Sequence, residues 1–231
     1  MAHLLGVENI VVSFPTKDVF DDITVGINDG DRIGVVGRNG DGKSTLLKLL
    51  AKRFEPDEGK VTYRGGLRVG LLDQADRIDE NLSVGAAVVG EIPEYVWASN
   101  PKVRDVIGGL LNDLDWNQTV GELSGGQRRR VALAALLVQD LDVVLLDEPT
   151  NHLDVEGVAW LARHLNQRWN ASSGGLVVVT HDRWFLDAVC NYTWEVFGGK
   201  IEPFEGGYAA YILQRTERDR SAAATETRRR N

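Results

Sequence analysis

Apolar and polar positions along the chain fall into two repeating patterns. Apolar runs of strand length, at 32–36, 143–146 and 176–180, alternate with longer segments in which apolar residues recur at helical spacing. The helical spacing is clearest at 44–52 and 156–169. Strands that alternate with helices are typical of a parallel sheet covered by helices, so the pattern predicts an α/β fold.

Two regions depart from this alternation. The segment from about 4 to 33 reads as strands broken by turns, of which Asn28-Asp29-Gly30-Asp31 is the strongest. It predicts an N-terminal β-subdomain. From about 75 to 122 the pattern changes to helical segments, one that Ser83 is placed to cap and one beginning at Pro101. We interpret this region as an inserted α-helical subdomain.

These patterns predict one large domain over residues 1–214. Its core comprises 1–75 and 128–214, and its helical subdomain comprises 76–127. Residues 215–231 are rich in arginine and alanine and almost without large apolar groups. We interpret them as the start of a basic interdomain linker, with a frayed tail as the alternative.

Composition narrows the functional classes. The 231-residue chain is 43% hydrophobic, which is enough for a substantial core, and its net charge of −8 argues against a surface that binds nucleic acid throughout. A local basic patch remains compatible with this charge. Cys190 is the single cysteine, so no internal disulfide forms. No secretory signal and no apolar run of about 20 residues is present, so we expect a cytoplasmic protein.

A glycine-rich segment follows the apolar run at 32–36. It fits the phosphate-loop pattern G-x-x-x-x-G-K-[ST] and opens a helical pattern. Glycines let backbone N–H groups turn towards phosphate oxygens, and the helix N-terminus adds partial positive charge. Lys43 is placed to reach the β- and γ-phosphates, and the Ser44 hydroxyl to bind Mg²⁺. The expected nucleotide-binding residues are Gly37, Asn39, Gly40, Asp41, Gly42, Lys43, Ser44 and Thr45.

Two carboxylates end the apolar run at 143–146. Asp147, at the end of the expected strand, is placed to hold Mg²⁺ through water. Glu148 is placed to polarise an attacking water as general base. A strand that ends in an acidic turn is common by itself, so this interpretation depends on the phosphate loop in the same chain.

The segment Leu123-Ser124-Gly125-Gly126-Gln127 precedes a long helical pattern. Ser124 and the glycine N–H groups at a helix start form a second anion site of phosphate size. Because L-S-G-G-Q is the signature of the ATP-binding cassette family, the chain is identified as a member, and the resemblance covers essentially its whole length. The resemblance implies a P-loop NTPase core with a mixed, mainly parallel sheet and an antiparallel N-terminal β-subdomain.

The same resemblance implies a second cassette, supplied by the same full-length chain or by a homodimer. In such pairs Ser124 and Gly126 of one unit close over the ATP held by the other unit. Gln74 matches the glutamine that senses Mg²⁺, and His181 matches the switch histidine that contacts the γ-phosphate. Phe14 matches the aromatic residue that stacks on adenine, with Phe20 as its rival.

Three stretches resemble the ABC-F group of soluble twin-cassette proteins: 147–154, 181–187 and 204–211. The short span between Gln74 and the signature leaves no room for the long inserted arm of some members, which favours the Uup-like branch. This resemblance implies ribosomes with their rRNA, or branched DNA, as partners, and no membrane-spanning partner.

The leading hypothesis is therefore an ATPase that uses ATP and Mg²⁺, with Glu148, His181 and Gln74 as catalytic residues and Ser44, Gln74 and Asp147 at the metal. One alternative is the ATP-binding subunit of a membrane transporter. Another is a nucleotide-gated binding module with slow turnover. Contact with RNA or DNA would come from arginines such as those at 128–130, for which a solvated helix face is the simpler interpretation.

Overall fold

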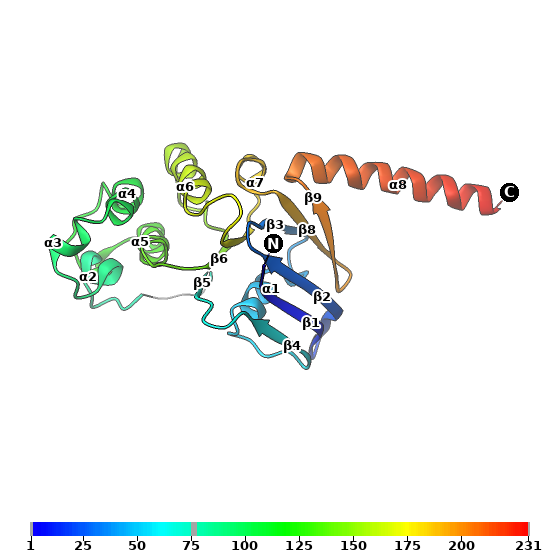
Figure 1. The fold of residues 1–231 in the computed structure, drawn as a ribbon, viewed down its shortest axis with the longest axis horizontal. Helices are drawn as coiled ribbons and strands as arrows, with labels where there is room; N and C mark the ends of the chain where they lie inside the picture. The colour runs from blue at the N-terminus through cyan, green and yellow to red at the C-terminus, as the bar shows by residue number, and fades with distance from the viewer. Residues whose placement is uncertain (1, 75–77, 231) are drawn as a thin grey trace.

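The computed structural model describes residues 2–74 and 78–230 (Figure 1). The strands are β1 (His3–Phe14), β2 (Lys17–Asn28), β3 (Arg32–Gly37), β4 (Glu58–Tyr63), β5 (Val69–Leu72), β6 (Val143–Asp147), β7 (Gly175–Val179), β8 (Tyr192–Phe197) and β9 (Lys200–Glu205). The helices are α1 (Lys43–Leu50), α2 (Val84–Val89), α3 (Glu94–Trp97), α4 (Pro101–Leu110), α5 (Gly125–Leu137), α6 (Val155–Gln167), α7 (Arg183–Val189) and α8 (Tyr208–Arg230), with a 3₁₀ turn, η1, at Val120–Glu122.

The N-terminal strands form a small antiparallel sheet in the order β2-β1-β4. A short turn joins the first two strands, since β1 ends at Phe14 and β2 begins at Lys17. This arrangement confirms the antiparallel N-terminal subdomain.

The main sheet has the order β5-β6-β7-β3-β8-β9 among the described residues. Its strands are parallel except for β9, which pairs antiparallel with β8. This sheet confirms the predicted mixed α/β fold. Because β6, β7 and β3 are neighbours, the loops that follow them meet at one carboxyl edge of the sheet, which is where ligands bind in such folds.

The central strands β6 and β7 of the main sheet are buried on both faces. Leu145 belongs to an apolar cluster that also contains residues of the small sheet and of α1, whereas its neighbour Leu146 belongs to a cluster shared with α5, α6 and α7. Successive side chains of a strand point to opposite faces, so a strand with two buried faces reads as a continuous apolar run. This explains the unbroken apolar sequence at 143–146.

Helices α2, α3 and α4 lie beside α5 at one end of the molecule, away from the small sheet (Figure 1). The cap expected at Ser83 is present, because its side chain accepts a hydrogen bond from the Ala86 backbone N–H. Helix α4 begins at Pro101, with Asn100 as its cap. The boundaries of a helical subdomain at 76 and 127 remain a prediction.

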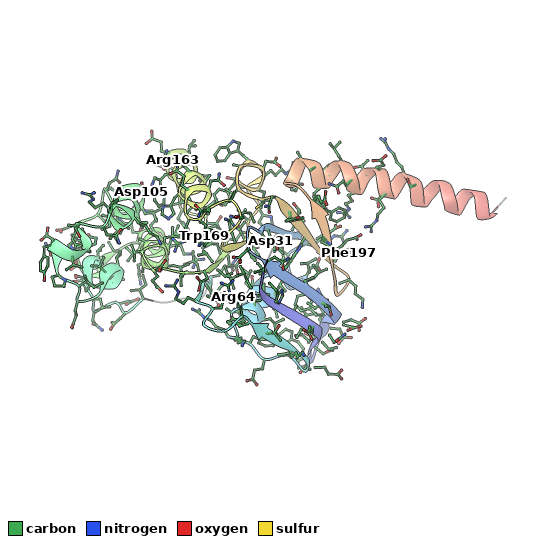
Figure 2. All side chains as sticks on the ribbon, in the orientation of Figure 1. Asp31, Arg64, Asp105, Arg163, Trp169 and Phe197 are labelled. Carbon is green, nitrogen blue, oxygen red and sulfur yellow. The ribbon has the colours of Figure 1, made fainter. Side chains whose placement is uncertain are left out.

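A polar cluster at the edge of the core ties the exposed Asp105 of α4 to two buried residues of α6. The Asp105 carboxylate accepts hydrogen bonds from Trp160 Nε1, at 3.2 Å, and from His164 Nδ1, at 3.0 Å. The Trp160 and His164 rings are stacked with their centroids 4.9 Å apart. Burial lowers the pKa of His164, while the hydrogen bond to Asp105 opposes that change. Figure 2 labels Asp105 on α4.

Two adjacent glycines of α4 allow a direct test of this contact. A Cβ atom at Gly109 would lie 2.1 Å from the Trp160 ring, whereas one at Gly108 would meet nothing within 4 Å. We expect Gly109→Ala to lower the free energy of unfolding by about 1–3 kcal/mol, because the ring must move. The control Gly108→Ala should raise it by up to about 1 kcal/mol through helix propensity. Urea denaturation measures both, and equal effects would contradict the close packing.

Helix α8 begins at Tyr208, within the predicted domain, and continues through the segment interpreted as a linker (Figure 1). Its first turns are fixed to β8. Glu195 accepts a hydrogen bond from the Tyr211 hydroxyl, at 2.9 Å, and pairs with Arg215, at 2.5 Å. Burial, followed by the hydrogen bond to Glu195, raises the pKa of Tyr211 to about 12. No helix of the described residues is long and apolar enough to cross a membrane.

Candidate active site

The glycine-rich loop lies between β3 and α1, at the carboxyl edge of the main sheet. Gly40 and Gly42 have φ values of 84° and 101°, which only glycine adopts without strain. A Cβ at Gly42 would also lie 2.4 Å from Val19. The buried Lys43 ammonium donates hydrogen bonds to the carbonyls of Gly37, at 2.9 Å, and Arg38, at 3.0 Å. The loop is thus wrapped around Lys43, which lies at its centre.

Lys17 is a residue at this site that the sequence analysis did not identify. Its ammonium donates a hydrogen bond to the Gly40 carbonyl, at 2.8 Å, and lies 3.5 Å from the Asp41 carboxylate. It thereby joins the start of β2 to the phosphate loop. A single lysine at the start of a strand carries no motif, so no sequence signal marked it.

Asp147 ends β6 and is 1% exposed. Gln74 Nε2 lies 3.4 Å from its Oδ1 atom, while Oδ2 has no hydrogen-bond partner. Burial raises the pKa of the Asp147 carboxyl, and a hydrogen bond with Ser44 opposes the rise. An orphaned, buried carboxylate oxygen beside a serine hydroxyl and an amide fits a hard divalent cation. Within the described residues no group of three or more His, Cys, Asp or Glu forms a metal cage, so phosphate or water oxygens would complete the coordination.

Glu148 follows Asp147 in the left-handed region, with a φ of 51°. Its backbone N–H donates to the Val179 carbonyl at 2.7 Å, which fixes it against β7. His181 follows β7, and its Nε2 atom lies 3.3 Å from Glu148 Oε1. Burial raises the pKa of Glu148, and the nearby His181 opposes the rise. A buried carboxylate with a raised pKa, held in a strained backbone conformation, is typical of a general base.

One cavity of about 690 Å³ brings most of these residues together. The predicted site residues that line it are Phe14, Asn39, Gly40, Gly42, Lys43, Ser44, Thr45, Gln74, Asp147, Glu148 and His181. Gly37 and Asp41 belong to the same loop without lining the cavity. The structure therefore joins the phosphate loop, the two carboxylates and the histidine from three neighbouring strands.

The two candidate aromatic residues differ in access to this cavity. Phe14 is 42% exposed, lines the cavity, and packs against Phe54 with ring centroids 5.8 Å apart. Phe20 is fully buried in the core, where its ring approaches Gly42. Phe14 is therefore the ring available for stacking on a base.

Ser124 and Gly126 do not reach the phosphate loop of their own chain. Ser124 caps α5 in a capping box with Gln127, and Gly126 approaches His152 at the start of the 151–154 loop. Both residues border a separate cavity of about 860 Å³ between α4, α5 and α6. Their N–H groups stand at a helix start, where an anion binds favourably.

The arginines at 128–130 are engaged within the chain. Arg128 pairs with Glu80 at 2.5 Å, and Arg130 forms a two-point pair with Asp113 at 2.6 and 2.8 Å. Arg129 donates to backbone carbonyls, including that of Asp147 at 2.7 Å. The cluster is therefore a partly exposed helix face whose arginines already have partners in the chain, which disfavours a free nucleic-acid patch here.

A family model described as "ABC transporter" matches residues 20–151. The chain is 34% identical over 267 aligned positions to the "Uncharacterized ABC transporter ATP-binding protein YfmR" of Bacillus subtilis (strain 168), covering 99% of this chain and 42% of that protein. It is 33% identical over 254 positions to the "Energy-dependent translational throttle protein EttA" of Escherichia coli (strain K12), covering 94% of this chain and 45% of that protein. The chain thus spans less than half the length of these relatives.

Solved structures show the same fold. An ATP-binding subunit of an ABC transporter superposes with a TM-score of 0.76 at 17% identity, covering 87% of this chain and 90% of that one. A bacterial Atm1-family ABC exporter with ATP bound superposes with a TM-score of 0.75 at 22% identity, covering 93% of this chain and 40% of that one. At these identities the likeness concerns the fold alone.

Proposed function

Because the chain belongs to the ABC transporter family of ATP-hydrolysing cassettes and resembles its ABC-F members, we propose that it is one cassette of a twin-cassette protein that acts in translation. The ATPase reaction is supported most strongly by one observation. Loops after β3, β6 and β7 place Lys43, the orphaned Asp147 oxygen and the Glu148–His181 pair around one cavity.

In this proposal ATP lies along the phosphate loop with its base on Phe14. Lys43 exchanges its two carbonyl partners for β- and γ-phosphate oxygens, and the loop N–H groups bind the remaining oxygens. Ser44, Asp147 and Gln74 would hold Mg²⁺. The chemistry that Mg²⁺ supplies when bound is neutralisation of charge on the phosphate oxygens.

The hydrolytic step rests on Glu148 and His181. Glu148 orients water in line with the γ-phosphate and accepts its proton, because the raised pKa brings the carboxylate closer to the operating pH. His181 lies 3.3 Å from Glu148 and is placed to donate to the γ-phosphate. Catalysis is then mainly positioning and charge stabilisation of the transferred phosphoryl group.

A second cassette completes the site in this proposal. Ser124 and Gly126 lie away from their own phosphate loop, so only another cassette can bring such a signature loop over the γ-phosphate. The relatives are more than twice as long as the matched segment, which leaves room for a second cassette in the same protein. ATP binding would close the pair and hydrolysis would open it.

The translation role is supported by relatives whose name is "energy-dependent translational throttle protein". The test is the ATPase rate of the full-length protein, measured with ribosomes, with branched DNA and with neither, at one fixed salt concentration. We expect ribosomes to raise the rate and branched DNA to leave it unchanged. Stimulation by DNA alone would contradict the translation role, and no response to either would favour the ATP-binding subunit of a transporter.

A further inference from the structure

A third cavity, of about 350 Å³, lies between the phosphate loop, β8 and α8; we call it the α8 cavity. It shares Lys43 and His181 with the candidate active site, but its other walls come from the end of β3 and the start of the phosphate loop, from Thr180, and from α7, β8 and α8. Phe197, one of its wall residues, stands at the end of β8 (Figure 2). The α8 cavity is at the lower end of the size range of small-ligand sites.

The charge of the α8 cavity is opposite to that of the whole chain. Four permanent cations line it: Arg38, Lys43, Arg183 and Arg215. The carboxylate among the described lining residues is Glu195, which forms an ion pair with Arg215 and accepts a hydrogen bond from the Tyr211 hydroxyl. The chain as a whole has a net charge of −8. A positive cavity within an acidic protein is a local feature that the overall composition does not explain.

Two of these cations are not neutralised. Within the described residues, the Arg38 and Arg183 guanidinium groups make no ion pair and no hydrogen bond through their side chains. Each instead faces an aromatic ring, with Arg183 Cζ 5.1 Å from the centroid of Tyr208 and Arg38 Cζ 5.9 Å from that of Phe197. A guanidinium held against a ring keeps its N–H edges available for an oxyanion.

We propose that the α8 cavity binds a phosphate dianion, with Arg183 as its principal ligand and Arg38 as a second. The planar guanidinium matches the spacing of two phosphate oxygens, which is the strongest form of charge-assisted hydrogen bond. The phosphate comes either from inorganic phosphate or from a small phosphate ester whose organic part packs on the Tyr208 and Phe197 rings. Glu195 remains with Tyr211 and Arg215, so it does not repel the ligand.

The test is titration calorimetry with inorganic phosphate and, separately, with phenyl phosphate, at constant ionic strength. The protein is first saturated with Mg²⁺ and a non-hydrolysable ATP analogue, which fills the neighbouring phosphate positions. We expect one phosphate per chain to bind, and Arg183→Ala to weaken it about tenfold or more, as the loss of a charged hydrogen bond implies. Tighter binding of phenyl phosphate than of phosphate would identify a small ester, and equal binding would identify inorganic phosphate.

Arg104→Ala is the matched control. Arg104 lies exposed on α4, outside the α8 cavity, and its replacement removes the same single charge. The control should change phosphate affinity by less than about twofold, because surface charges at this distance are screened. Absence of binding to the unaltered protein, or equal weakening by Arg183→Ala and Arg104→Ala, would overturn the proposal. Failure of the ATP analogue to bind would count against the proposed function. The effect of Arg183→Ala on phosphate affinity can still be measured in the absence of the analogue.

Discussion

Replacing Glu148 by glutamine is expected to lower the ATPase kcat about a thousandfold while ATP stays bound. Glutamine keeps the shape of the side chain but cannot accept the proton of the attacking water. Burial and the backbone bond to β7 hold the position of residue 148, so binding of the nucleotide should not change. Because hydrolysis would normally reopen the cassettes, the variant should accumulate as an ATP-bound pair, visible by size-exclusion chromatography with ATP.

The control for this prediction is Glu91→Gln, the same chemical change at an exposed position after α2. The Glu91→Gln variant should retain the ATPase kcat of the unaltered protein and should not accumulate as an ATP-bound pair under the same conditions. A Glu148→Gln protein that stays monomeric in ATP and loses ATP affinity would show that the role given to Glu148 is wrong.

Replacing Lys43 by methionine is expected to weaken ATP binding about a hundredfold. The Lys43 ammonium is the buried cation at the centre of the phosphate loop, and methionine keeps its length without its charge. The loss of charged contacts to two phosphates, each worth roughly 1.5–3 kcal/mol, accounts for this magnitude. Equilibrium binding of a fluorescent ATP analogue measures the change.

Lys48→Met, five residues along α1, is the comparison variant. Lys48 pairs with Asp73 at 3.2 Å and does not line the nucleotide cavity. Its replacement should leave ATP affinity within about threefold, since a partly exposed ion pair contributes little. If both lysine variants lose affinity equally, the effect belongs to the charge of α1 and not to a contact between Lys43 and phosphate.

The parts of the site that could be predicted are those encoded by local sequence. The segment 37–45 specifies its own turn, glycines and helix start, and the apolar run before Asp147 specifies a buried strand. The parallel-sheet rule then places the ends of neighbouring strands together. The approach of His181 to Glu148 follows from the adjacency of β6 and β7, which the sequence implied only through the family resemblance.

The parts that could not be predicted depend on partners far away in the chain. In the sequence, the arginines at 128–130 are a run of like charges without visible partners. Their partners Glu80 and Asp113 come from separate segments, and only the fold brings them close. Phe14 and Phe20 lie on either side of the same turn, and Phe20 is buried because β2 packs it into the apolar core beside the phosphate loop. Rules based on residue spacing describe neighbours in the sequence, so they do not predict these contacts between distant segments.

The anchoring of α8 to β8 has a mechanical consequence. Glu195 is paired in register with Val36, the residue before the phosphate loop, so Tyr211 and Arg215 connect the helix to that strand pair. Helix α8 has 23 residues and is about 35 Å long. With its first turns fixed to β8, a tilt of about 5° at the root would move the far end by about 3 Å over that length. Any tilt of β8 beside the phosphate loop would therefore produce its largest displacement at the far end of this helix.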